Sequence, residues 1–208
     1  MAHLCSTHPT HPSARLLQNT AEALRRGGVI ALPTDCCYVL ACAFDNKDAA
    51  EQIRRIRGVD ERHHLTLICP TLSSIAQFAR VDNAQYRWLK ACTPGSYTFI
   101  LEGSKELPRR LLHPKRKTLG LRIPAHPLCL ALLEQLQEPL LSASLILPGD
   151  EFALTEAWEI QDSLDNQLAL ILDAGQCGGA PTTIIDLSDG TPKLIRQGKG
   201  ALAPLGLA

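Results

Sequence analysis

Residues 27–42 encode an apolar strand that ends in a polar turn, and they read Gly27-Gly28-Val29-Ile30-Ala31-Leu32-Pro33-Thr34-Asp35-Cys36-Cys37-Tyr38-Val39-Leu40-Ala41-Cys42. The two glycines predict the end of a helix, and the apolar run that follows predicts a buried strand. Pro33 ends that strand because it has no backbone N–H to donate. Thr34, Asp35 and Tyr38 are therefore expected at the carboxyl end of a strand, where open α/β sheets bind ligands. Taken alone, the turn is better explained without a ligand, by an Asp35 side chain that bonds to nearby backbone groups.

Helix and strand patterns interleave along the rest of the chain, which predicts an α/β or α+β fold with a mixed sheet. Helices are expected near residues 13–26, 45–57, 73–80, 82–91, 127–136 and 155–164. Strands are expected near residues 29–32, 38–43, 65–69, 96–101, 118–123, 139–146, 168–172, 182–187 and 193–197. The last two strands flank Ser188-Asp189-Gly190, a sequence typical of a hairpin turn, so part of the sheet is expected to be antiparallel.

Length and composition indicate an ordinary globular chain. Its 208 residues suit a single domain over residues 14–208, preceded by an N-terminal arm over residues 1–13. The formal net charge is zero, so no overall field attracts the protein to nucleic acid or to a membrane. Pro33, Thr34 and Asp35 interrupt the longest apolar stretch, so no membrane span is expected. The N-terminus has no signal-peptide pattern, and we therefore expect a cytoplasmic protein.

Eight cysteines are present, and most lie in apolar runs without a paired C-x-x-C pattern. They are predicted to be small buried residues rather than disulfides or zinc ligands. A zinc site could be built from His3, Cys5, His8 and His11, but a flexible arm does not hold ligands in tetrahedral geometry. No protein-bound metal is therefore expected. Cys36 and Cys37 are possible nucleophiles, but no histidine is placed to activate them.

Cations gather between residues 109 and 122, a segment without a carboxylate: Arg109, Arg110, Lys115, Arg116, Lys117 and Arg122. Such a run is typical of phosphate or nucleic-acid binding, and it is equally explained by a solvated loop beside acidic neighbours. Arg122 differs because apolar strand residues flank it, so it needs a buried acid or an anionic ligand. Side chains that could hold a carboxylate or phosphate also lie at other strand ends: Ser142, Ser144, Thr182 and Arg196.

The order of these motifs resembles the YrdC/YciO family of threonylcarbamoyl-AMP synthases. The resemblance runs over about residues 14–200 and rests on six segments in order: residues 27–38, 93–101, 121–124, 139–144, 181–186 and 195–198. They contain Pro33-Thr34-Asp35, Thr93-Pro94-Gly95, Leu121-Arg122-Ile123-Pro124, Ser142-Ala143-Ser144, Pro181-Thr182-Thr183 and Ile195-Arg196-Gln197-Gly198. Residues 108–118 and 144–149 resemble the YciO branch in particular.

The resemblance implies a twisted, open mixed sheet with flanking helices and a large, concave basic cavity. Family enzymes join L-threonine, bicarbonate and ATP, with Mg²⁺ on the phosphates, into threonylcarbamoyl-AMP for the t6A modification of tRNA. Carried over by position, Thr34 and Tyr38 would line the threonine end, and Arg122 would meet the threonine carboxylate. The residues that would face ATP or AMP are Arg57, Ser142, Ser144, Thr182 and Arg196.

Two positions depart from the family pattern. The synthases carry Lys-x-Arg where this chain reads Arg57-Gly58-Val59, and Ser-x-Asn where it reads Ser144-Leu145-Ile146. One cation and one amide are lost, and losing a single hydrogen bond to a charged group weakens binding by about 1.5–3 kcal/mol. Two functions follow: a weak or divergent synthase, or a protein of the same fold that binds a nucleotide or double-stranded RNA without efficient synthesis.

Overall fold

The computed structural model describes residues 3–61, 63–105, 107–113 and 115–207. Within these residues ten strands form one sheet in the order β1-β8-β2-β3-β7-β4-β6-β5-β9-β10. The strands are β1 His3–Ser6, β2 Ile30–Pro33, β3 Tyr38–Ala43, β4 Thr66–Ile68, β5 Tyr97–Glu102, β6 Thr118–Arg122, β7 Leu140–Ser144, β8 Leu170–Asp173, β9 Thr183–Asp186 and β10 Lys193–Arg196. Four neighbouring pairs are parallel and five are antiparallel, so the predicted mixed α/β sheet is confirmed.

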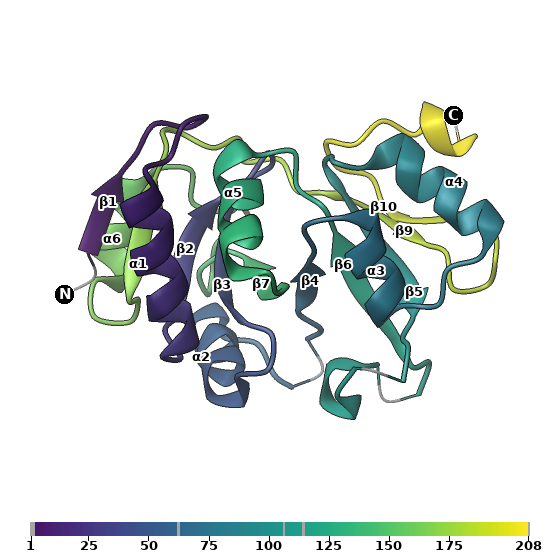
Figure 1. Cartoon of the computed structure of the whole chain (residues 1–208), viewed down its shortest axis with the longest axis horizontal. Coiled ribbons are helices and arrows are strands. Elements are labelled where there is room, and N and C mark those ends of the chain that lie inside the picture. Colours follow the sequence, from purple (N-terminus) through teal and green to yellow (C-terminus); the bar gives the residue numbers. More distant parts are fainter. Residues whose placement is uncertain (1–2, 62, 106, 114, 208) are drawn as a thin grey trace.

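Helices cover both faces of this sheet. They are α1 Ala14–Arg25, α2 Lys47–Arg57, α3 Leu72–Phe78, α4 Asn83–Cys92, α5 Pro127–Leu136 and α6 Ala157–Leu164, with short 3-10 turns η1 Arg109–Leu111 and η2 Ala203–Leu205. Helices α1 and α5 lie side by side (Figure 1) and bury Leu32 and Val39. In β3, Tyr38 and Leu40 flank Val39 and point to the opposite face of the sheet, because successive side chains of a strand alternate in direction. They join the core formed with α2, α3, α4 and α6.

The helix ends coincide with capping residues that are readable in the sequence. Ser13 Oγ accepts from Leu16 N at 3.2 Å, and Asn46 Oδ1 accepts from Ala49 N at 2.9 Å. Gly58 closes α2 with φ +61°, a conformation that glycine adopts without steric cost. Helix α2 is therefore held in place at both ends, and Arg57 is its last residue.

Strand β1 runs parallel to β8, with register from His3↔Leu170 to Ser6↔Asp173. The sequence predicted an arm over residues 1–13, and the structure instead places part of that segment in the sheet. Backbone hydrogen bonds attach this edge strand, while its side chains are exposed or half-buried. A hydrophobic pattern does not report such pairing, so the sequence contained no apolar signal for it.

The opposite end of the sheet is the predicted hairpin, in which β9 and β10 are antiparallel. Strand β10 is the edge strand, and all four of its residues are exposed. No helix in the described residues is both long enough and apolar enough to cross a membrane.

Candidate functional site

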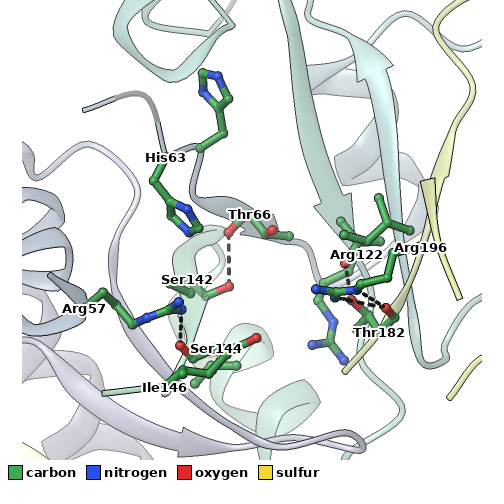
Figure 2. Close-up of a pocket in the computed structure, with 14 residues that line it drawn as sticks. Arg57, His63, Thr66, Arg122, Ser142, Ser144, Ile146, Thr182 and Arg196 are labelled. Atoms are coloured by element: carbon green, nitrogen blue, oxygen red, sulfur yellow. Dashed lines mark hydrogen bonds between the residues drawn. The ribbon is translucent and has the colours of Figure 1, made fainter. Parts of the chain in front are cut away.

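A cavity of about 170 Å³ lies over the middle of the sheet. Side chains from strands β3 to β7, β9 and β10 line it, together with the end of α2 and the loop at residues 63–64. Figure 2 shows Arg57, Ser142 and Ser144 on one side and Arg122, Arg196 and Thr182 on the other. Six residues that the sequence assigned to ligand binding are therefore brought together from five separate segments.

Small side chains keep this face of the sheet open. Ser142 pairs with Thr66, and Thr66 pairs with Gly120, so three adjacent strands present two hydroxyl groups and no bulky group. A Cβ atom on Gly120 would lie 3.3 Å from Thr98 Cγ2 and 3.4 Å from Thr66 Oγ1, which is tighter than ordinary contact. A larger residue at position 120 would therefore fill the floor between these strands.

Hydrogen bonds orient the polar groups of the cavity. Arg57 Nη1 donates to the carbonyl oxygen of Ser144, which attaches the end of α2 to strand β7. Arg196 donates to the carbonyl oxygen of Thr182, from Nε at 3.4 Å and from Nη2 at 3.1 Å. Two guanidinium groups are thus fixed to the backbone on opposite sides of the cavity, where they can neutralise an anion between them.

Arg122 forms a buried ion pair with Asp35. Its Nη2 lies 2.7 Å from Asp35 Oδ1, and the two side chains are only 4% and 8% exposed. Ser96 Oγ donates to the other carboxylate oxygen, Oδ2, at 2.6 Å. The buried acid that Arg122 requires is therefore Asp35, whose carboxylate contacts side chains from other strands rather than the backbone of its own turn.

Thr34 and Tyr38 direct their hydroxyl groups elsewhere, and the cavity lining does not include them. Thr34 Oγ1 donates to Cys37 O at 2.7 Å and accepts from the N–H of Cys36 at 3.2 Å. Tyr38 is fully buried, its hydroxyl donates to Gly175 O at 3.2 Å, and burial raises its pKa. These two residues build the turn that carries Asp35.

Some lining residues were missed from the sequence, namely His63, His64, Thr66 and Thr98. Burial and the nearby Arg57 charge lower the pKa of His63, so its ring is neutral at pH 7. The His-rich loop at residues 58–64 was the available signal for the two histidines. The two threonines lie on strands, and only the pairing order shows that they face Ser142 and Arg122.

The basic run at residues 109–117 is divided between two parts of the surface. Arg110 Nη2 donates to Asp45 O at 2.5 Å and lines a cavity beside Lys47 and Arg54, away from the central one. The side chain of Arg109 lies outside the part of the chain that the structure describes, while its backbone begins η1.

Arg116 lines a second cavity of about 410 Å³ that adjoins the central one, since both include His64, Thr66 and Thr98. It forms an ion pair with Asp186 at 3.7 Å, and its own side chain is 64% exposed. Lys115 and Lys117 are exposed next to it. Of these three cations Arg116 lines the adjoining cavity, a placement that the spacing of the sequence alone did not establish.

Neither a thiol nucleophile nor a metal cluster is evident at this site. Cys36 and Cys37 are buried, and burial raises the pKa of both thiols, which disfavours the reactive thiolate. In the described residues no group of three His, Cys, Asp or Glu side chains is arranged to hold a metal ion. The arrangement instead offers cations and hydroxyl groups, which suit binding of carboxylates and phosphates.

Known proteins similar in sequence match almost the whole chain. Residues 22–198 match the family profile Sua5_yciO_yrdC, described as "Telomere recombination". The uncharacterized protein YciO of Escherichia coli (strain K12) is 48% identical over 204 residues, which cover 98% of this chain and 99% of YciO. Human threonylcarbamoyl-AMP synthase is 33% identical over 190 residues, which cover 88% of this chain and 67% of the human protein.

Solved structures show the same fold. The crystal structure of E. coli YciO matches with a TM-score of 0.94 at 48% identity, covering 99% of this chain and 100% of that one. The crystal structure of P. abyssi Sua5 complexed with L-threonine matches with a TM-score of 0.86 at 23% identity, covering 94% of this chain and 57% of that one. Sequence and fold together show that the chain belongs to the Sua5/YciO/YrdC family and is homologous to the threonylcarbamoyl-AMP synthases.

Proposed function

We propose that this protein is a slow threonylcarbamoyl-AMP synthase, which joins L-threonine, bicarbonate and ATP into threonylcarbamoyl-AMP and pyrophosphate. One observation carries the proposal: Arg57, Arg122 and Arg196 converge on a single cavity whose lining also includes five residues with hydroxyl groups, namely Thr66, Thr98, Ser142, Ser144 and Thr182. Relatives support it, since human threonylcarbamoyl-AMP synthase is homologous and P. abyssi Sua5 was solved with L-threonine.

The reaction requires positioning rather than a covalent intermediate. The threonine amine takes up bicarbonate with loss of water and becomes a carbamate. A carbamate oxygen then attacks the α-phosphorus, and the bond from that phosphorus to pyrophosphate breaks. Both reactants are anions, so the main contribution of the protein is to hold them together and to neutralise charge. A site with three guanidinium groups and two inaccessible thiols suits that task.

Arg122 is the proposed partner of the threonine carboxylate, because it lies in the cavity and its Nε is buried without an acceptor among the described residues. Arg57 and Arg196 are the proposed partners of the phosphates. Both guanidinium groups are already oriented by backbone carbonyl oxygens, which lowers the entropy cost of binding. Thr182 and Ser144 complete the nucleotide side.

Mg²⁺ is proposed to enter with ATP. The side chains that fit it are few, since the carboxylate of Asp35 is already bonded to Arg122 and Ser96. The phosphates and water would therefore supply most of the oxygen ligands, as is usual for Mg²⁺ with nucleotides. The ion would offset phosphate charge, and the arginines would hold the same phosphates from the other side.

Slow turnover is proposed because this chain differs from the synthases at two positions of the family motifs. Ile146 lines the cavity where the synthases carry an asparagine, and an isoleucine side chain supplies no hydrogen bond. Val59 replaces the second cation of the family motif, one residue beyond the turn at Gly58. Each change removes a polar contact to the substrates, and each such loss costs about 1 kcal/mol or more.

The test is an incubation of the protein with L-threonine, bicarbonate, ATP and Mg²⁺, read by mass spectrometry for threonylcarbamoyl-AMP. We expect product from the wild type and none from Arg122→Ala. Lys193→Ala is the matched control, because Lys193 lies on β10 and pairs with Asp189 at 2.6 Å, away from the cavity lining. Product that persists in Arg122→Ala would refute the assignment of the site.

A second candidate function is binding of a nucleotide or double-stranded RNA without efficient synthesis. The observation that favours it is the exposed row Lys115, Arg116 and Lys117, of which Arg116 lines the adjoining cavity. Neutralising all three should reduce the slope of RNA affinity against salt concentration, because each phosphate contact releases counterions. An unchanged slope would count against RNA as the ligand.

A further inference from the structure

Asp35 connects the strand-end turn to β6, to the residue that precedes β5 and to the loop after β10. Its two carboxylate oxygens accept from Arg122 Nη2 at 2.7 Å and from Ser96 Oγ at 2.6 Å. Its backbone carbonyl oxygen accepts from Lys199 Nζ. The carboxylate thus has a separate partner on each oxygen, which fixes its orientation, and Lys199 adds a second positive charge beside it.

Arg122 is bound to Asp35 through one nitrogen only. The ion pair uses Nη2, and Arg122 Nε is buried and has no acceptor among the described residues. A guanidinium group presents Nε–H and one Nη2–H along the same edge, a fork that matches the two oxygens of a carboxylate. A buried N–H without a partner is uncommon in folded proteins and calls for a ligand or an ordered water.

The charges around the Asp35–Arg122 pair favour binding of one anion. Arg122 and Lys199 contribute two positive charges, and Asp35 contributes one negative charge. The cluster is therefore positive by one, which one carboxylate would neutralise. Without Asp35 the orientation of the Arg122 guanidinium group would no longer be fixed, because no other carboxylate pairs with it within the described part of the chain.

We propose that Asp35 is a positioning residue: with Ser96 it holds Arg122 by Nη2 so that the Nε edge receives the carboxylate of an amino-acid substrate. This inference rests on the proposed function, since L-threonine is the amino acid in question. It assigns to the acidic residue of the Pro33-Thr34-Asp35 turn a role in ligand geometry rather than in the turn itself. The threonine of that turn already satisfies the local backbone.

The test combines binding with NMR of protein labelled with ¹⁵N-arginine, with the Arg122 signal assigned by its loss in Arg122→Lys. L-Threonine should shift the Arg122 Nε–H signal, whereas L-threoninol, which lacks the carboxylate, should not. Asp35→Asn should weaken L-threonine binding about 10-fold or more, the usual effect of losing a hydrogen bond to a charged group. Its affinity for ATP should stay within about twofold of wild type, because a fold-wide defect would weaken both ligands.

Matched variants keep the test decisive. Asp189→Asn removes the carboxylate of an exposed ion pair and should leave both affinities unchanged. Asp35→Glu should restore part of the L-threonine affinity, because it retains the charge. If Asp35→Asn does not fold, Ser96→Ala removes only one hydroxyl group and should weaken L-threonine binding about threefold, a neutral hydrogen bond being worth less than a charged one.

The outcomes separate this inference from the proposed function. If the wild type binds L-threonine and Asp35→Asn binds it equally well, Asp35 has no positioning role, whatever the synthase assay shows. If no threonylcarbamoyl-AMP forms but L-threonine binding depends on Asp35, the positioning role stands and the synthase proposal fails. If L-threonine neither binds nor moves the Arg122 Nε–H signal, both are wrong.

Discussion

Replacing Arg122 with methionine should destabilise the protein more than a typical substitution does. Methionine retains much of the length of the arginine side chain but removes its charge. The Asp35 side chain, which is only 8% exposed, then keeps its carboxylate but loses its ion-pair partner. Ser96 still donates to that carboxylate, and Lys199 still contacts the same residue, so the charge is not wholly uncompensated.

Removing one partner of a buried ion pair typically costs about 3–5 kcal/mol, and the Ser96 hydroxyl on the carboxylate with the Lys199 charge beside it places our expectation at about 3 kcal/mol. With a urea dependence of about 2 kcal/mol/M, this lowers the unfolding midpoint by about 1.5 M. The double variant Arg122→Met with Asp35→Asn carries no buried charge at this place. We therefore expect the double variant to be more stable than Arg122→Met alone, although it carries one more substitution.

Urea unfolding followed by circular dichroism measures these differences for the wild type, both single variants and the double variant. A cost below about 1 kcal/mol at pH 7, or single-variant costs that simply add in the double variant, would refute the reasoning.

Three further predictions concern the cavity. Gly120→Val should weaken ATP binding by crowding Thr66 and Thr98, which line the central cavity, while Gly179→Ala, whose Cβ would lie 3.7 Å from Thr155, should not; equal affinities in calorimetry would contradict this. Ile146→Asn should raise threonylcarbamoyl-AMP production about tenfold by restoring one polar contact. The control Ile195→Asn, on the exposed edge strand, should not raise it. An unchanged rate of Ile146→Asn by mass spectrometry would disprove the prediction. The lowered pKa of His63 means that the folded state binds fewer protons than the unfolded state, so stability is full above pH 6.5 and falls below it. His63→Gln should flatten that decline between pH 6.5 and pH 5, and an identical decline would show that other groups cause it.

Much of the fold was readable along the chain because its signals are local. Apolar runs, prolines and capping residues predicted the helices and the nine strands from β2 to β10, and the Ser188-Asp189-Gly190 turn predicted the closing hairpin. The strand His3–Ser6 was not predicted, because backbone pairing with β8 holds it and its side chains are mostly exposed. Arg122 was singled out for a similar local reason: a charged residue inside an apolar strand needs a partner.

Reading the chain residue by residue identifies the polar side chains available to the site, among them Arg57, Arg122, Arg196 and several strand-end hydroxyl groups, and it indicates no activated thiol. It also identifies the family, through motifs that keep their order along the chain. Which of these residues meet depends on the fold. The order β3-β7-β4-β6-β5-β9 brings Ser142, Thr66 and Arg122 to one face, although 20 or more residues separate each of them from the next. It also pairs Arg122 with Asp35 across 87 positions, because the partner of a buried charge is chosen by strand order and not by distance along the chain.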